Sequence, residues 1–227
     1  MKKIIGMLFA ILIATSAFAF QASLGVRGNA NFQVGTTVNK DNVTLNQDAH
    51  PGIGGGFGVY TNLGFVNFGK VLFGIRPEFD MNFKNGFYFK KEGSVITTRT
   101  DFTTDTIDIP VLITFGIPFS ETLKLDLGAG PYISFPFNGW KSVGNTLSAL
   151  GSWATTTEGK TSPVNWGVAF DAGLGFKLGP GYIMMDVRYM LDLNETKARA
   201  VVAGETVEKG LFTRRSLNVG LGYELVF

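Results

Sequence analysis

The sequence of 227 residues contains no cysteine and only one histidine. A chain without cysteine forms no disulfide bond, which excludes the small secreted scaffolds that disulfides hold together. Structural zinc sites are excluded as well, because several cysteines and histidines build them. The stretch "NKDN" (Asn39–Asn42) is too short for the ligand spacing of a calcium loop. We therefore expect neither a metal site nor a cofactor.

A hydrolase site is equally hard to assemble from this sequence. His50 lies beside Pro51 in a long polar segment, and the hydrophobic pattern places no serine near it. A Ser–His–acid triad needs its histidine held between the nucleophile and a carboxylate. The glycine-rich strings lie in predicted strands and open no helix, which argues against a phosphate-binding loop. We interpret His50 as a solvated loop residue and expect no catalytic residue and no enzymatic activity.

A long apolar run occurs only at the start of the chain. Lys2 and Lys3 precede an apolar stretch that ends in the small-x-small sequence "AFA". The stretch is shorter than the roughly 20 residues that a spanning helix needs. We predict a signal peptide at residues 1–19 and one domain at residues 20–227, with an uncleaved anchor as the alternative.

An excess of positive charge is also missing. Removal of the two leader lysines leaves 18 of the 20 basic residues against 18 acidic ones. Nucleic-acid binding requires a clustered basic excess, so no nucleic-acid partner is expected.

Apolar residues alternate with small or polar ones throughout the rest of the chain, and no segment has a convincing helical period. The alternation predicts an all-β fold of eight strands: Ser23–Val34, Gly52–Tyr60, Lys70–Phe83, Thr106–Phe115, Leu123–Phe137, Asn165–Lys177, Tyr182–Asp192 and Arg214–Phe227. Short links at 61–69, 116–121 and 178–181 alternate with long polar ones. This pattern is typical of an antiparallel up-and-down transmembrane barrel with both termini on the periplasmic side.

The direction of the apolar face separates this barrel from a soluble, lipocalin-like one. An eight-stranded barrel has an interior that side chains just fill, and this many large apolar residues would overfill it. The opposite face is rich in glycine rather than in the lysine and glutamate of a soluble exterior. Both features favour an apolar face turned toward lipid.

The chain ends on Phe227, after apolar residues at alternate positions. Unpaired backbone groups in hydrocarbon cost several kcal/mol each, so the last strand should close on the first and place Phe227 in an interfacial girdle. The phrases "IDIPVLITF", "LKLDLGAGPYISF", "WGVAFDAGLGF" and "GYIMMDVRYML" resemble the small eight-stranded outer-membrane barrels of the OmpX, OmpW and PorT type. No further domain is expected after Phe227.

This resemblance implies a location in the outer membrane of a Gram-negative-type (double-membrane) bacterium after secretion to the periplasm. It also implies contact with outer-membrane lipid, insertion by the barrel-assembly machinery and a monomeric state. The residues that match the family's insertion signal are Tyr223, Leu225 and Phe227.

Six charged residues should point into the lumen at a similar height. These are Arg27, Arg76, Glu78, Asp171, Asp186 and Arg188. Three bases and three acids balance, and charges removed from bulk water persist when they are paired. We interpret the cluster as a plug of ion pairs; a gate or a narrow ion path is the alternative.

Arg214 and Arg215 are predicted to begin the last strand. By parity Arg215 faces the lipid at the outer interface, where it could bind a lipid phosphate. Snorkelling of its side chain into the interface is the alternative.

The alternation of the third strand continues beyond Phe83. A turn at Glu92-Gly93-Ser94 would keep like faces together along the hairpin. It would pair Phe83 with Thr103, Phe79 with Ile107 and Ile75 with Val111. The strand would be about 60 Å long at roughly 3.3 Å per residue. A tilted membrane strand needs only about 9 to 11 residues. The hairpin should therefore project as a stiff arm that offers Phe87, Tyr88, Phe89, Lys90 and Lys91 to a partner; a flexible loop is the alternative.

Two functions remain open at this point. The first is a surface protein that acts in adhesion, defence or membrane integrity through its four loops. The second is a narrow passive channel or transporter for small or apolar solutes.

Overall fold

The computed structural model describes residues 21–37, 49–68, 70–92, 96–148, 151–159, 164–194, 196–202 and 205–227. Every regular element within these ranges is a β-strand. Accordingly, the described chain has no helix long and apolar enough to cross a membrane. The predicted signal peptide and the stretch Asn39–Asn42 lie outside the described residues.

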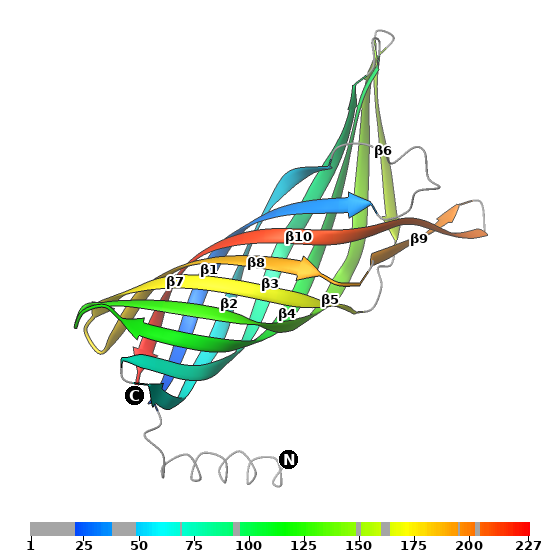
Figure 1. Ribbon diagram of the computed structural model, residues 1–227. Coiled ribbons are helices and arrows are strands. Elements are labelled where there is room, and N and C mark those ends of the chain that lie inside the picture. Colours follow the sequence, from blue (N-terminus) through cyan, green and yellow to red (C-terminus); the bar gives the residue numbers. More distant parts are fainter. Residues whose placement is uncertain are drawn as a thin grey trace.

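Eight strands form the wall of a closed barrel (Figure 1). They are β1 (Gln21–Thr37), β2 (Ala49–Phe68), β3 (Val71–Glu92), β4 (Ile96–Pro118), β5 (Leu123–Ser148), β7 (Asn165–Leu178), β8 (Gly181–Asp192) and β10 (Glu205–Val226). Each pairs antiparallel with its neighbours, and β1 pairs with β10 from Ser23↔Val226 to Thr37↔Phe212. This last pairing closes the ring and confirms the predicted eight-stranded antiparallel barrel.

Two shorter strands were not predicted. β6 (Gly151–Gly159) pairs with the C-terminal part of β5, and β9 (Thr196–Val202) pairs with the N-terminal part of β10. β6 is mostly polar, and β9 is short and alternates only the small residues Ala198 and Ala200 with Lys197 and Arg199, so neither has the alternating large apolar residues that marked the other strands. Their extended conformation follows from backbone hydrogen bonds to a long neighbour, a signal that hydrophobic periodicity does not carry.

The wall strands are also longer than the alternation indicated. The link predicted at residues 61–69 is mostly strand, because β2 continues to Phe68, which pairs with Val71. β2 also begins at Ala49, so His50 lies in a strand opposite Tyr88 and not in a loop. A register shift between Gly64 and Val66 interrupts the alternation there. A bulge of this kind continues the ladder while it breaks the pattern in the sequence.

The predicted register of the β3–β4 hairpin is wrong. Ile75 pairs with Ile113 and not with Val111, and Met81 takes the place of Phe79 opposite Ile107. Above an irregularity between Asn82 and Asn85, Thr103 pairs with Gly86 instead of Phe83. Glu92, expected in the turn, pairs with Thr97. Register in a hairpin depends on the turn and on every bulge below it, and neither was visible in the sequence.

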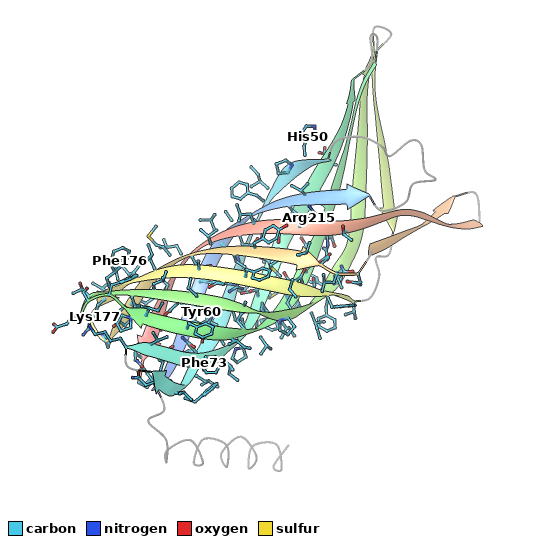
Figure 2. All side chains as sticks on the ribbon, in the orientation of Figure 1. His50, Tyr60, Phe73, Phe176, Lys177 and Arg215 are labelled. Carbon is cyan, nitrogen blue, oxygen red and sulfur yellow. The ribbon has the colours of Figure 1, made fainter. Side chains whose placement is uncertain are left out.

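The two faces of the barrel differ sharply in chemistry (Figure 2). Large apolar side chains cover the outside: Ile53 is 72% exposed and Leu221 is 60% exposed. Polar and charged side chains fill the inside, where Glu78 and Arg188 are almost fully buried. An apolar band of this extent is stable against lipid and not against water, which excludes the lipocalin-like alternative.

The C-terminal strand is held at both of its edges near the end. The Phe227 amide donates a hydrogen bond of 2.9 Å to the Ala22 carbonyl of β1. The Tyr223 hydroxyl donates one of 2.9 Å to the Leu178 carbonyl at the end of β7. The adjacent β7–β8 turn contains Gly179 at a φ of 60°, a conformation that favours glycine. The Phe227 ring itself is exposed, on the rim where the short turns lie.

We predict that deletion of Phe227 sharply lowers insertion of the protein into the outer membrane. The deletion removes the last hydrogen bond between β10 and β1 and the aromatic ring at the rim. The measurement is the amount of folded protein in outer-membrane fractions, scored by the gel shift between unheated and boiled samples. Phe119→Ala, which removes an exposed ring from the β4–β5 turn at the same rim, is the control. Normal insertion of the truncated chain would contradict the prediction.

Candidate functional site

A layer of charged residues crosses the middle of the lumen. Where a strand contributes more than one residue, these lie two positions apart, because alternate positions of a strand share one face. β1 supplies Arg27, β3 supplies Arg76, Glu78 and Asp80, β7 supplies Asp171, and β8 supplies Asp186 and Arg188. All seven are buried. We call these seven residues the lumen charge cluster.

Arg188 lies at the centre of the cluster, with no exposed surface. Its two terminal nitrogens, Nη1 and Nη2, both lie 2.7 Å from the Glu78 carboxylate, one on each oxygen. Nη1 also lies 3.2 Å from Asp80 Oδ2, and Nη2 lies 2.8 Å from Asp171 Oδ2. One guanidinium therefore ties β8 to β3 across the lumen and to β7 beside it.

The other two arginines complete the network from β1 and β3. Arg27 Nη2 lies 2.6 Å from Asp80 Oδ2 and 3.0 Å from Glu78 Oε2, while its Nη1 lies 3.3 Å from Asp186 Oδ1. Arg76 donates to Glu78 Oε1 at 2.8 Å and to Asp171. The six residues selected from the sequence thus lie in one connected set of ion pairs.

Asp80 belongs to the same set although sequence analysis left it out. It has the parity of Arg76 and Glu78, so the alternation already placed it on the inner face. Its inclusion changes the charge of the cluster to three cations and four anions. Glycine makes room for it, because a Cβ at Gly58 would overlap Asp80 Oδ1. A Cβ at Gly220 would overlap the Asp186 carboxylate in the same way.

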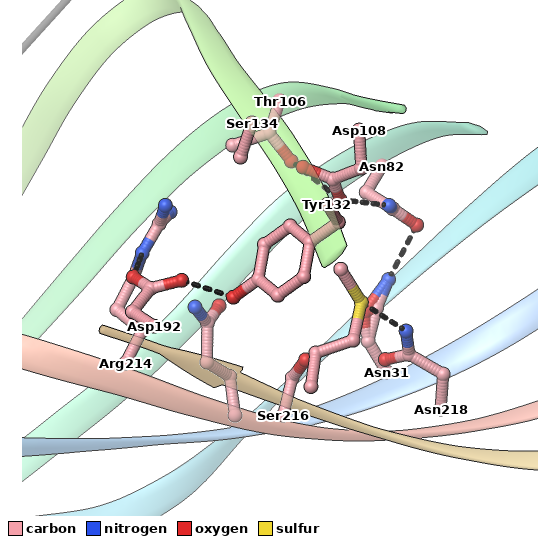
Figure 3. Close-up of a pocket in the computed structure, with 12 residues that line it drawn as sticks. Asn31, Asn82, Thr106, Asp108, Tyr132, Ser134, Asp192, Arg214, Ser216 and Asn218 are labelled. Atoms are coloured by element: carbon pink, nitrogen blue, oxygen red, sulfur yellow. Dashed lines mark hydrogen bonds and ion pairs between the residues drawn. The ribbon is translucent and has the colours of Figure 1, made fainter. Parts of the chain in front are cut away.

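A polar pocket lies in the lumen on the extracellular side of the cluster (Figure 3). It encloses about 20 Å³, enough for about one water molecule. Asp192 accepts a hydrogen bond from the Tyr132 hydroxyl and one of 3.1 Å from Arg214 Nε. On another wall Asn82 donates to Asp108 at 2.6 Å. This pocket was not predicted from the sequence; the one available signal was the alternation, which places Arg214 on the face opposite Arg215 and so inside the lumen.

The structure separates the two arginines that were expected at the start of the last strand. β10 begins at Glu205, so Arg214 and Arg215 lie within it. Arg214 is buried in the lumen, whereas Arg215 is exposed on the outer face between Val34 of β1 and Leu191 of β8. The position of Arg215 fits both expectations made for it, a lipid phosphate contact and snorkelling.

The remaining predicted residues lie apart from the lumen. Phe87, Tyr88, Phe89, Lys90 and Lys91 fall within β3, but their side chains lie outside what the structure describes. His50 is half-buried on β2. Over the described ranges, no group of three or more His, Cys, Asp or Glu side chains is placed to hold a metal ion.

A closed barrel with an apolar exterior and an ion-paired interior defines an integral β-barrel protein of a membrane. The chain matches the family model "Outer membrane protein beta-barrel domain" over residues 16–198, and it belongs to this family. It is therefore a protein of the outer membrane of a double-membrane bacterium.

Solved structures of outer-membrane proteins resemble it at low sequence identity. OprG from Pseudomonas aeruginosa is 15% identical with a TM-score of 0.53, over 90% of this chain and 96% of OprG. A major outer membrane protein of Thermus thermophilus is 12% identical with a TM-score of 0.47, over 91% and 99%. Ail, the attachment invasion locus protein of Yersinia pestis, is 14% identical with a TM-score of 0.35, over 90% and 98%. A search of curated proteins finds no match. The likeness to OprG shows a shared fold.

We predict that Arg188→Met lowers the free energy of unfolding by about 3–5 kcal/mol, because it leaves the partner carboxylates buried without a counter-charge. The measurement is urea unfolding of the protein reconstituted in lipid vesicles. The matched control is Arg215→Met on the exposed outer face, which should change the free energy by less than about 1 kcal/mol. Equal small effects of the two substitutions would show that the ion pairs contribute little.

Proposed function

We propose that this protein is a non-enzymatic surface protein of the outer membrane, with a closed lumen and with extracellular strands and loops that bind a partner. The observation that carries the proposal is the lumen charge cluster. A solute would have to separate several buried ion pairs in order to pass, and breaking one buried pair already costs about 3–5 kcal/mol. The lumen is then closed to solutes, and the extracellular strands and loops are the part of the protein that can bind a partner.

The extracellular part of the barrel supports this role. β3 and β4 remain paired up to Glu92↔Thr97, and β4 and β5 up to Ile96↔Ser148. β6 extends the same sheet, from Trp140↔Gly159 to Ser148↔Gly151. These four strands rise well beyond the other described strands in Figure 1. We propose that this sheet, the surface arm, contacts the partner through Phe87, Tyr88, Phe89, Lys90 and Lys91, in adhesion, defence or membrane integrity.

The absence of enzymatic activity rests on the sequence. Its one histidine is on β2 and contributes nothing to the lumen charge cluster, whose groups are all carboxylates and guanidiniums. At the outer rim, we propose that Arg215 binds a phosphate group of an outer-leaflet lipid. We also propose that Tyr223, Leu225 and Phe227 are recognised by the barrel-assembly machinery and that the inserted protein is a monomer.

A narrow channel is the second candidate, and one observation favours it. The charge cluster has a cavity on each side of it: the polar pocket of about 20 Å³ and a larger one of about 150 Å³ at the periplasmic end. The lumen therefore contains some open space on both sides of the charge cluster.

Conductance across planar bilayers distinguishes these two functions. We expect the reconstituted protein to give no steady single-channel steps, because the charge cluster closes the lumen. Arg215→Ala, on the outer face, serves as the control for non-specific leakage. Steady steps in the unmodified protein that Arg76→Ala abolishes, and Arg215→Ala does not, would replace the surface role with the channel.

Amide hydrogen exchange tests the surface arm. We expect slow exchange at the strand-paired amides of residues 86–92 and 96–102, because a rigid sheet protects them. Glu121, in the β4–β5 turn, gives the rate of an exposed connection in the same sample, because the amides of Phe119, Ser120 and Thr122 beside it donate hydrogen bonds. Equally rapid exchange across 86–102 would mean that the arm is a mobile loop.

A further inference from the structure

A cavity of about 150 Å³ lies at the periplasmic end of the lumen, below the charge cluster. Its walls come from strands that are far apart in sequence but converge at this rim. They include Asn62 of β2, Thr114 of β4, Lys124 and Asp126 of β5, Tyr182 of β8 and Glu224 of β10. These residues take part neither in the proposed surface role nor in the lumen charge cluster.

Lys124 shows what chemistry the cavity accepts. Its Nζ atom lies 2.6 Å from Glu224 Oε1 and 2.9 Å from Asp126 Oδ2. The same atom lies 4.8 Å from the centre of the Tyr182 ring. Two carboxylates and an aromatic face are the groups that bind an ammonium ion in water-poor sites. The cavity therefore already binds one primary ammonium group, supplied by the chain itself.

The two carboxylates are not satisfied by this one cation. Asp126 and Glu224 are each 1% exposed. Asp126 Oδ1 and Glu224 Oε2 have no hydrogen-bond partner among the described residues. Buried carboxylate oxygens are costly when they lack a donor. Asp126 and Glu224 together carry two negative charges against the one positive charge of Lys124, so the group has one negative charge in excess. Lys70 also lines the cavity, but it is exposed to solvent.

The cavity is separated from the charge cluster above it. Tyr60, which is 5% exposed, lies between them, and the Arg76 guanidinium covers its ring at 5.4 Å. Tyr60 also interacts with Glu224 from this side. A Cβ at Gly25 would overlap the ring, so glycine is needed there to admit it. Arg76 interacts electrostatically with Asp126 from the other side, but among the described residues the ion pairs of Asp126 and Glu224 are formed with Lys124 and not with an arginine of the lumen charge cluster.

We infer that this cavity is a binding site for a small primary ammonium ion that enters from the periplasm. The ammonium group donates to Asp126 Oδ1 and Glu224 Oε2 beside Lys124, which completes an alternating arrangement of two cations and two anions. The remaining volume holds a short alkyl chain of the ligand. A metal ion fits less well, because the described part of the chain provides no cluster of three acidic, histidine or cysteine ligands.

This inference does not depend on the proposed surface role. The site opens on the periplasmic side, so a barrel that conducts and a barrel that is closed would both contain it. A negative result in the conductance or exchange experiments would therefore not contradict the periplasmic site. A negative result for the site would likewise not contradict the proposed surface role.

The test is a titration of the isotope-labelled protein in lipid nanodiscs with ethylammonium, followed by NMR at the amides of residues 124–126 and 224. We expect saturable shifts confined to the periplasmic rim. Tetramethylammonium carries the same charge but has no N–H group, so it should bind at least about tenfold more weakly, the loss expected when charge-assisted hydrogen bonds are not made. Equal binding of the two ions, or tighter binding of Mg²⁺ at the same amides, would overturn the inference.

Substitutions in the site should move the affinity in opposite directions. Asp126→Asn and Glu224→Gln keep the side-chain shape and should weaken ethylammonium binding roughly tenfold or more, the loss expected for a charge-assisted hydrogen bond. Lys124→Ala should strengthen it to a similar extent, because both carboxylates become available. If Lys124→Ala folds poorly, ethylammonium should restore its folding yield.

Asp192→Asn, a buried carboxylate in the outer pocket, is the matched control and should leave the affinity unchanged. The gel shift between unheated and boiled samples verifies that each variant is folded. The inference is wrong if Asp126→Asn binds ethylammonium as well as the unmodified protein does. It is also wrong if neither the unmodified protein nor Lys124→Ala shows saturable binding.

Discussion

The hydrogen-bonded ring of backbone groups is the constraint on which the rest of this structure depends. Within hydrocarbon no water is present to pair an N–H or C=O group, so every strand must have a neighbour on both sides. The β1–β10 pairing meets this requirement along β1 from Ser23 to Thr37. Once the ring is closed, alternate side chains must point outward and inward, and the outward set must be apolar. The residues that line the lumen are then the small, polar and charged ones at the alternate positions.

The lumen of an eight-stranded barrel is narrow, and its charges must therefore find partners in one another. Arginine suits the middle of this lumen because its planar group can donate to several carboxylates at once. Arg188 does so with both oxygens of Glu78 and with two aspartates. Lysine, a compact charge on a flexible stem, occurs instead at the periplasmic end, where Lys124 has an open cavity beside it. Gly58 and Gly220 lie against the carboxylates of Asp80 and Asp186, and a Cβ at either glycine would overlap them. The lumen therefore has room for these carboxylates only because glycine lies beside them.

The sequence was sufficient to predict the fold because alternation over eight segments allows few other architectures. Alternation also placed all seven cluster residues on the inner face, although only six were selected as the cluster, because the side of a strand that a residue faces does not depend on where the strand ends. Where each strand begins and ends, and which residues pair with each other across neighbouring strands, were harder to predict. The turn of the β3–β4 hairpin lies later in the chain than predicted, since Glu92 pairs with Thr97, and the shift at Gly64 made part of β2 resemble a link. β6 has no apolar face and β9 has only a short one of small residues, and their pairing depends on neighbours that the alternation does not reveal.

Contacts across the lumen were the least predictable feature. Glu224 and Lys124 are 100 residues apart, on strands that do not pair with each other. Whether they meet depends on the stagger of strands around the whole barrel, which alternation does not determine. The same stagger places Tyr60 between the plug and the periplasmic cavity. One layer of ion pairs and one aromatic ring thus divide the interior into two compartments with different chemistry. Because the charge cluster and Tyr60 lie between the two compartments, an event at the surface arm and a ligand at the periplasmic rim are expected to influence each other through movement of the wall strands. The ion pairs between β1, β3, β7 and β8 oppose that movement, so the two ends of this barrel are expected to act independently.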